Sequence, residues 1–224
     1  MEAVILAGGF GTRLSSVVND VPKPMAPVNG KPFLYYLLKY LRRFNFTKIV
    51  LALGYLYEEI INYFGYDFEG IELVYSVEEE PLGTGGSVKK ALKLLKESYV
   101  FVINGDTYFE IDYNSINTNK ELLIVCKYLS DLCRYGSLII NDDRIIEFKE
   151  KNNDGSGYIN GGVYLLKKDI FDKFNMPNKF SLEKDFFQRY VKEIYIDSYI
   201  ENGYFIDIGI PKDYYQFIED FSFE

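Results

Sequence analysis

The chain has 224 residues, a formal net charge of −8 at pH 7, two cysteines and no histidine. This length suits one domain that buries its core without disulfides, and the scattered basic residues argue against a nucleic-acid partner. The absence of histidine excludes Ser-His-Asp and Cys-His catalysis and metal binding through histidine.

The cysteines and the N-terminal segment indicate the cellular compartment in which the protein is expected. Cys126 and Cys133 are too few and wrongly spaced for a zinc site or a disulfide framework, and Cys126 is expected in the core. The apolar stretch before Gly8 is too short for a secretory signal, and no apolar run approaches membrane-spanning length. We therefore expect a cytoplasmic protein with reduced thiols and no membrane partner.

Strands and helices alternate in the first half of the chain. Apolar runs predict the strands, and apolar residues at helical spacing, such as Leu34, Leu37, Leu38 and Leu41, predict the helices. The predicted strands are 2–7, 48–53, 71–75 and 99–103, and the predicted helices are 32–44, 57–64 and 84–97. This pattern predicts an α/β fold, with a Rossmann-like, mostly parallel sheet flanked by helices and ligands at the carboxyl ends of its strands.

The second half of the chain has shorter apolar segments separated by turn residues. The predicted strands are 122–127, 138–140, 145–148, 158–165, 193–198 and 204–207, and the predicted helices are 168–174, 182–190 and one beginning at Pro211. The first four of these strands are expected to be antiparallel additions that cover one side of the ligand site. No linker or internal repeat divides the chain, so residues 1–224 are predicted to form a single domain.

A glycine-rich loop follows the first predicted strand. Gly8, Gly9 and Gly11 leave backbone N–H groups uncrowded, as an anion-binding loop requires. Arg13 follows at once, and Lys23 lies between two prolines, so two cations stand near this loop in an acidic chain. The ligand is expected to carry phosphates.

Other readings of the glycines fit less well. The dinucleotide fingerprint needs a third glycine where Leu14 stands, and a Walker A loop needs Ser or Thr after Lys31, where Pro32 stands. A tight turn without a ligand is the alternative for a lone Gly-Gly pair. The added glycine, arginine and lysine favour phosphate binding.

Two aspartates, Asp106 and Asp207, each come at the end of an apolar strand. An Asp after Gly is often only a turn former, but two strand-end carboxylates suit Mg²⁺ when substrate phosphates and water fill its other positions. A negatively charged chain that binds phosphates must supply positive charge locally, so a divalent metal is expected.

The motifs carry a family resemblance. Residues 6–14, Leu-Ala-Gly-Gly-Phe-Gly-Thr-Arg-Leu, followed by Pro22-Lys-Pro24, resemble the signature of the sugar-1-phosphate nucleotidyltransferases. Further segments resemble family motifs in the same order along nearly the whole chain: 80–86, 104–106, 148–151, 159–163, 181–185 and 205–211. The resemblance implies a nucleotide-diphosphosugar transferase fold, with a nucleotide-binding part, 1–111, and a sugar-binding part, 112–224. It also implies an NTP and a sugar 1-phosphate as substrates and Mg²⁺ on Asp106 and Asp207.

The resemblance assigns further roles by position. The catalytic residues it implies are Arg13, Lys23 and Lys151. The nucleotide-binding residues it implies are Leu6, Ala7, Gly8, Gly9, Gly11, Thr12, Arg13, Glu80, Pro81, Gly83, Thr84 and Asp106, and the sugar-binding residues are Gly105, Glu150, Lys151, Asn160 and Gly161. Asn152 stands where the family usually has proline, and residues 149–151 alone would read as a solvated, charged strand end.

The absence of histidine fits this chemistry. A sugar 1-phosphate, with a second pKa of about 6, is a dianion near neutral pH and attacks the α-phosphorus without a protein base. Glu80 is either the acceptor for the two donors of the guanine edge or a helix-capping residue.

Within the family, the compact length and the segments 22–27, 83–86 and 158–163 look most like the D-glycero-α-D-manno-heptose 1-phosphate guanylyltransferases of bacterial surface-polysaccharide pathways, so GTP is favoured. The enzyme alternatives are a mannose-1-phosphate guanylyltransferase and a hexose or N-acetylmuramate 1-phosphate uridylyltransferase. A non-catalytic nucleotide-sugar sensor is a further alternative, but it would be expected to lose Arg13 or a metal aspartate. The sequence leaves the assembly state open, with a homodimer as one option.

Overall fold

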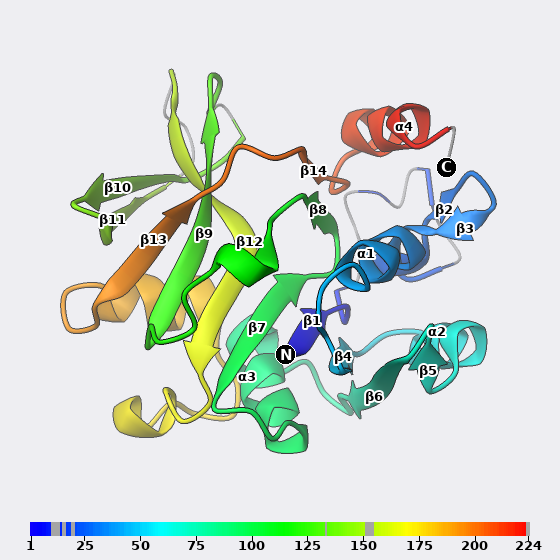
Figure 1. The fold of residues 1–224 in the computed structure, drawn as a ribbon, viewed down its shortest axis with the longest axis horizontal. Coiled ribbons are helices and arrows are strands. Elements are labelled where there is room, and N and C mark those ends of the chain that lie inside the picture. The colour runs from blue at the N-terminus through cyan, green and yellow to red at the C-terminus, as the bar shows by residue number, and fades with distance from the viewer. Residues whose placement is uncertain (10–13, 15–16, 19–20, 133, 151–154, 223–224) are drawn as a thin grey trace.

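The computed structural model describes residues 1–9, 14, 17–18, 21–132, 134–150 and 155–222. Its main element is a mixed ten-stranded sheet (Figure 1). In chain order these strands are β1 (Glu2–Leu6), β4 (Lys48–Leu53), β5 (Asp67–Phe68), β6 (Ile71–Val77), β7 (Tyr99–Asn104), β9 (Leu122–Leu129), β10 (Ser137–Asn141), β11 (Arg144–Lys149), β12 (Gly157–Lys167) and β13 (Ile196–Ile200). The order across the sheet is β10-β11-β13-β9-β12-β7-β1-β4-β6-β5.

The first half of the chain supplies the parallel part of the sheet, as predicted. The neighbouring strands β7, β1, β4 and β6 are parallel, so their carboxyl ends lie at one edge. Successive side chains point to opposite faces, with Ala3 and Ile5 in one hydrophobic core and Val4 in the other. In β1, β4 and β7 most residues on both faces are buried, which explains the apolar runs of these strands.

Helices cover both faces of the sheet. Side chains of α1 (Phe33–Leu41), α2 (Tyr57–Phe64) and α4 (Pro211–Asp220) belong to one core, and those of α3 (Gly83–Ala91) and the π-helix Leu182–Gln188 belong to the other. Short 3₁₀ turns lie at Lys23–Met25, Leu92–Leu94, Tyr113–Ser115 and Asp172–Phe174. No helix in the described part of the chain is long and apolar enough to cross a membrane.

Some predicted elements differ in the structure. The predicted helix 168–174 is wrong, because the Lys168 N–H still donates to the Ser98 carbonyl (2.9 Å), and only the turn Asp172–Phe174 forms before Asn175 with φ +46°. The predicted helix 84–97 ends at Ala91 and continues only as the 3₁₀ turn.

The second half extends the sheet beyond β7. β12 is antiparallel to β7 and β9, as expected, and β13 is parallel to β9. Two short pairs stand apart from the main sheet: β2 (Pro27–Val28) with β3 (Lys31–Pro32), and β8 (Thr107–Phe109) with β14 (Phe205–Asp207). In the second pair Asp207 lies opposite Thr107. The segments that carry Asp106 and Asp207 are therefore neighbours.

Candidate active site

The glycine loop begins where β1 ends, at the carboxyl edge of the parallel strands. The Ala7 N–H donates to the Ala52 carbonyl at 2.9 Å, so pairing with β4 continues past Leu6. Gly8 then approaches Gly54 so closely that an added β-carbon would lie 3.1 Å from the Gly54 nitrogen. An added β-carbon at Gly9 would have no described atom within 4 Å. The first glycine thus serves the close approach of two strand ends, and the second leaves backbone accessible.

A cavity of about 330 Å³, here the β1 cavity, opens at this edge between the strand ends and the start of α3. Most of the predicted nucleotide-binding residues in the described part of the chain line it. These are Leu6, Ala7, Gly8, Gly9, Pro81, Gly83, Thr84 and Asp106, joined by the predicted catalytic Lys23.

A second cavity of about 290 Å³, here the β12 cavity, lies beside the first. The predicted sugar-binding residues Glu150, Asn160 and Gly161 line it, and so does Asp207. Asp106 lines both cavities, together with Asn104 at the end of β7. The two cavities therefore meet at Asp106.

Lys23 faces both aspartates at this junction. Its Nζ lies 2.6 Å from Asp106 Oδ2 and 3.6 Å from Asp207 Oδ1. The lysine side chain is only 9 % exposed, whereas the Asp106 and Asp207 side chains are 36 % and 26 % exposed. One ammonium thus compensates two carboxylates that converge from separate parts of the chain.

Backbone contacts fix the two carboxylates. The Gly105 N–H donates to the Leu6 carbonyl at 2.9 Å, and an added β-carbon at Gly105 would lie 2.6 Å from that oxygen. The Ile208 N–H donates to the Asp106 carbonyl at 3.0 Å, and the Gly209 N–H to Asp207 Oδ1 at 2.7 Å. The turn after β7 and the turn after β14 therefore support each other.

The two aspartates fit a hard divalent cation. Their oxygens are ligands that Mg²⁺ prefers, and the ion usually keeps positions for substrate phosphates and water. Among the residues that the structure describes, no group of three or more acidic or thiol side chains is placed to hold a metal without such a substrate. A Mg²⁺ ion held by these two carboxylates would therefore need phosphate oxygens and water as its remaining ligands.

Asn160 is held in the β12 cavity by a polar network. Its Nδ2 donates to Glu183 Oε1 (2.9 Å) and to the Tyr164 hydroxyl (3.0 Å), and its Oδ1 accepts from the Gly162 N–H (2.9 Å). Burial raises the pKa of Tyr164 well above its ordinary value, so its hydroxyl stays neutral. The pairing of β12 with β9 shifts between Asn160 and Tyr164, which frees Gly161 and Gly162 from the regular ladder.

The acidic residues before α3 occupy different positions. Glu80 is exposed and lines a smaller cavity of about 250 Å³ that shares Gly8 and Pro81 with the β1 cavity. Glu78 lines both cavities, and its carboxylate accepts from the Leu82 N–H (3.0 Å) and from the Ser87 hydroxyl. Glu78 thus holds the turn that leads into α3, whereas Glu79 and Glu80 are exposed at the small cavity.

Several predicted residues cannot be placed. Gly11, Thr12, Arg13 and Lys151 lie outside the described residues, so their roles remain predictions. Gly105 is buried behind Asp106 and lines neither cavity.

The structure adds residues that were not predicted for the site. Asn104 is the last residue of β7, and Glu78 directly follows β6. Because ligands bind at the carboxyl ends of parallel strands, these positions could have indicated both residues. Glu183 and Lys184 reach the β12 cavity from the π-helix, far along the chain. No local sequence signal indicated where that helix would pack.

Comparison with known proteins gives consistent matches. A protein-family model described as nucleotidyl transferase matches residues 2–222. The D-glycero-alpha-D-manno-heptose 1-phosphate guanylyltransferase of Campylobacter jejuni is 46% identical over 220 residues, which cover 97% of this chain and 99% of that protein. A protein of the same name from Aneurinibacillus thermoaerophilus is 45% identical over 219 residues, covering 96% of this chain and 95% of that protein.

Solved structures agree with these matches. The crystal structure of HddC from Yersinia pseudotuberculosis superposes with a TM-score of 0.87 at 42% identity, covering 98% of this chain and 99% of that one. The same protein complexed with GMP-PN gives a TM-score of 0.86.

Proposed function

The chain belongs to the nucleotidyl transferase family, and from this membership we propose that it transfers GMP from GTP to D-glycero-α-D-manno-heptose 1-phosphate. Relatives named for this acceptor align with nearly the whole chain, and the GMP-PN complex of a 42% identical protein supports a guanine nucleotide. The observation that carries the proposal is the meeting of two cavities at Asp106, beside Lys23 and Asp207.

The two cavities suit two phosphorylated substrates. We assign GTP to the β1 cavity and the sugar 1-phosphate to the β12 cavity, so that their phosphates meet at Asp106. A phosphate oxygen of the sugar then forms a bond to the α-phosphorus of GTP. The bond from that phosphorus to the β-phosphate oxygen breaks, and pyrophosphate leaves. Holding the reactants in this alignment supplies much of the rate enhancement.

The charges of this chain fit that transfer. The sugar phosphate is already a dianion near neutral pH, so no protein base is required. Lys23 supplies a positive charge where the phosphates meet, and we propose Arg13 and Lys151 as further cationic contacts. Asp106 and Asp207 are the proposed ligands of Mg²⁺, which would neutralise phosphate charge when bound.

The Asn160 network supports recognition of the sugar. Its members are fixed by hydrogen bonds before any ligand binds, and Glu183 and Glu150 add carboxylate acceptors for sugar hydroxyls in the same cavity. We place the reaction in the cytoplasm, because Cys126 is a free thiol and such thiols are typical of a reducing compartment.

A pyrophosphate-release assay tests the proposal. GTP, ATP, CTP and UTP are each paired with the heptose 1-phosphate, mannose 1-phosphate, glucose 1-phosphate and N-acetylmuramate 1-phosphate. The highest kcat/KM is expected for GTP with the heptose. A higher value for mannose 1-phosphate would overturn the acceptor, a higher value for UTP would overturn the donor, and no release with any pair would favour the nucleotide-sugar sensor.

A further inference from the structure

A further cavity, of about 390 Å³, lies away from the proposed active site and is lined by charged residues. Five lysines line it: Lys89, Lys93, Lys96, Lys167 and Lys168. Among the described residues that line it, Asp169 and Asp172 are the only acidic ones. We call it the lysine pocket. It gathers a local excess of positive charge in a chain whose formal net charge is −8.

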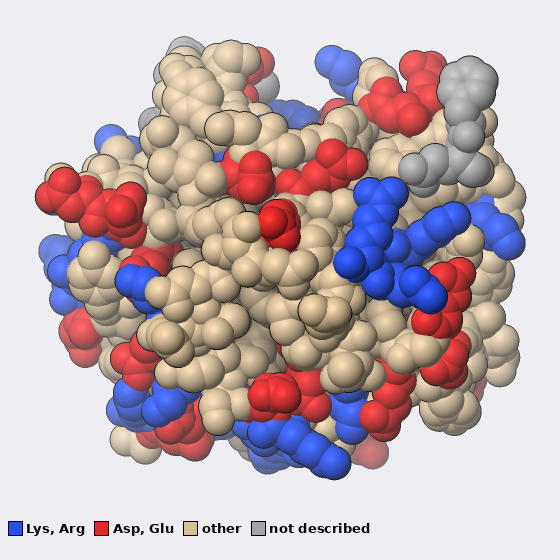
Figure 2. Space-filling model, in the orientation of Figure 1, with Lys and Arg blue, Asp and Glu red and all other residues tan. Residues whose placement is uncertain are grey.

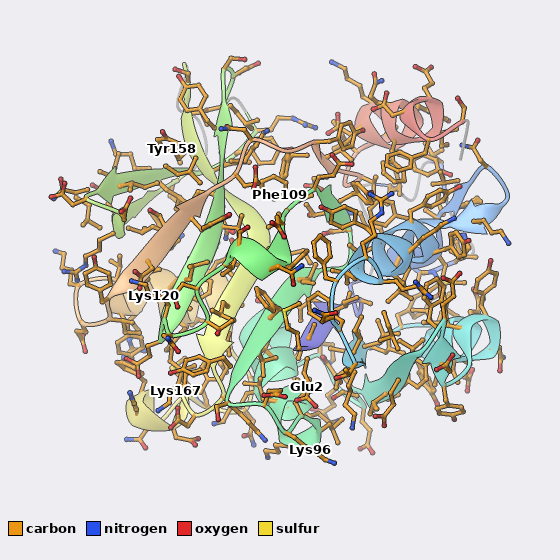
Figure 3. All side chains as sticks on the ribbon, viewed as in Figure 1. Glu2, Lys96, Phe109, Lys120, Tyr158 and Lys167 are labelled. Carbon is orange, nitrogen blue, oxygen red and sulfur yellow. The ribbon has the colours of Figure 1, made fainter. Side chains whose placement is uncertain are left out.

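The lysine pocket lies at the opposite edge of the sheet from the active site. Ser98 and Lys167, which line it, flank the amino end of β7, where Lys167 pairs with Tyr99. Asn104, at the other end of β7, lines the active-site cavities. A strand of six residues separates the two places by roughly 17 Å. Figure 3 labels Lys96 and Lys167 on the lower side of the molecule, away from β8 and β14 in Figure 1.

The lysines come from two separate elements. Lys89 belongs to α3, and Lys93 and Lys96 follow it, whereas Lys167 and Lys168 lie at the end of β12. Lysines near the end of one helix would be explained by the helix dipole alone. The added lysines of β12 are not explained in that way. Figure 2 shows blue lysine and arginine side chains at the lower edge of the molecule, where Figure 3 labels Lys96, with red acidic side chains beside them.

The contacts within the pocket separate structural lysines from available ones. Lys89 Nζ donates to the Met176 carbonyl and Lys168 Nζ to the Leu95 carbonyl, so these two hold the pocket together without losing their charge. Lys167 Nζ lies 3.1 Å from Asp169 Oδ2. Lys93 and Lys96 are exposed. The buried side chains of Leu92 and Phe171 also line the pocket, and this apolar surface weakens the screening of the lysine charges by water.

We propose that the lysine pocket binds a small anion with two or more phosphate groups. Ammonium groups that share one cavity lie within a Debye length of each other and repel, so a multivalent anion gains from all of them at once. Each phosphate group has several oxygens that accept from ammonium groups, so an anion with two phosphates can contact lysines of both chain segments. The proposal does not depend on the reaction assigned to the active site.

The pocket is joined to the active site through packed groups. The Phe171 ring packs on Phe180, with centroids 5.3 Å apart. The Phe180 carbonyl accepts from the N–H groups of Gly85 (3.0 Å) and Gly86 (3.3 Å), in the first turns of α3. Residues Gly83 and Thr84 of the same helix line the β1 cavity. Lys89 of α3 lines the lysine pocket, so a ligand bound there lies against the same helix that lines the proposed nucleotide site.

Lysine acetylation footprinting of the wild-type protein locates the ligand. Inorganic pyrophosphate, GDP and inorganic phosphate are the probes, and mass spectrometry measures the acetylation rate of each lysine. Pyrophosphate is expected to slow acetylation of Lys93 and Lys96, and not of the exposed Lys31 and Lys39 of the α1 region. Protection by GDP alone would identify a nucleotide as the source of the phosphates. Protection of Lys23 with no change at Lys93 and Lys96 for any probe would place all binding in the active site and overturn the proposal.

Calorimetry on variants tests the charge requirement. The double variant Lys93→Gln/Lys96→Gln should bind whichever probe protects the pocket roughly 10- to 100-fold more weakly at that site, because two charge-assisted contacts are lost. The Lys93→Arg/Lys96→Arg variant should retain binding, and Lys31→Gln/Lys39→Gln is the control with the same loss of charge. Wild-type affinity in the glutamine variant would overturn the proposal. If that variant does not fold, the footprint of the wild-type protein decides.

Discussion

The Lys23 ammonium lies 2.6 Å from Asp106 Oδ2, where the β1 and β12 cavities meet. The same Nζ lies 3.6 Å from Asp207. In this arrangement lysine holds together the two carboxylates that are also proposed to hold Mg²⁺. A bound Mg²⁺ ion would therefore compete with Lys23 to compensate the same negative charge.

The Lys23→Met variant tests this competition through stability. Without the ammonium, two carboxylates face each other uncompensated, so the free energy of unfolding in EDTA should fall by roughly 1–2 kcal/mol, a figure reduced because both carboxylates are partly hydrated. Added Mg²⁺ should raise the melting temperature more in the variant than in the wild-type protein. Lys31→Met, at an exposed lysine of β3, is the control. An equal Mg²⁺ effect in all three proteins would contradict the shared site.

The Asp207→Asn variant tests the metal assignment through activity. Asparagine keeps the shape of the side chain but removes the charge, so turnover at saturating Mg²⁺ should fall roughly 100-fold or more while the fold persists. Asp142→Asn is a matched control, since Asp142 is exposed and has φ +46°, a conformation that asparagine also adopts readily. Near-wild-type turnover of Asp207→Asn would show that this carboxylate is not a metal ligand.

The Glu80→Gln variant tests recognition of the base. If Glu80 accepts from both donors of the guanine edge, its loss should reduce the preference for GTP over UTP by roughly 1.5–3 kcal/mol, or about 10- to 150-fold in kcat/KM. Glu79→Gln is the matched control, because Glu79 lines the same small cavity. An unchanged preference in Glu80→Gln would assign Glu80 to helix capping and leave the donor proposal standing.

The pH dependence tests whether the protein supplies a base. With no protein base, the acid limb of kcat/KM for the sugar phosphate should follow the second ionisation of the substrate, near pH 6. Below that pH the monoanion predominates and the rate falls. A phosphonate analogue has a higher second pKa, so its acid limb should move upward by the same difference. Identical limbs for the two substrates would indicate an enzyme group, and Glu150 would be examined first.

The parallel half of the fold could be predicted because each of its strands is recognisable from its own short stretch of sequence. Each of β1, β4 and β7 contains a run of at least four apolar residues, and burial on both faces requires that composition. Asp106 and the glycines after β1 follow such runs directly. Their meeting at one sheet edge was therefore predictable from the alternation of strands and helices.

The remaining parts depend on contacts that the local sequence does not encode. β8 has only three residues and pairs with a strand from the far end of the chain, so nothing in its own sequence indicates a strand. The π-helix reaches the β12 cavity because Phe186 and Phe187 pack in the core beneath β12. For the same reason Glu183 was not predicted as a site residue, although its segment resembled a family motif.

The pairing of β8 with β14 has a consequence for biosynthesis. Asp106 leaves the ribosome about a hundred residues before Asp207, so the parallel strands are already synthesised while the second carboxylate does not yet exist. The nascent chain would then present a nucleotide cavity without a complete metal site. Catalytic competence would arise in one late step, when the strand after residue 204 docks beside residues 107–109, and an incomplete chain would be folded in part but inert.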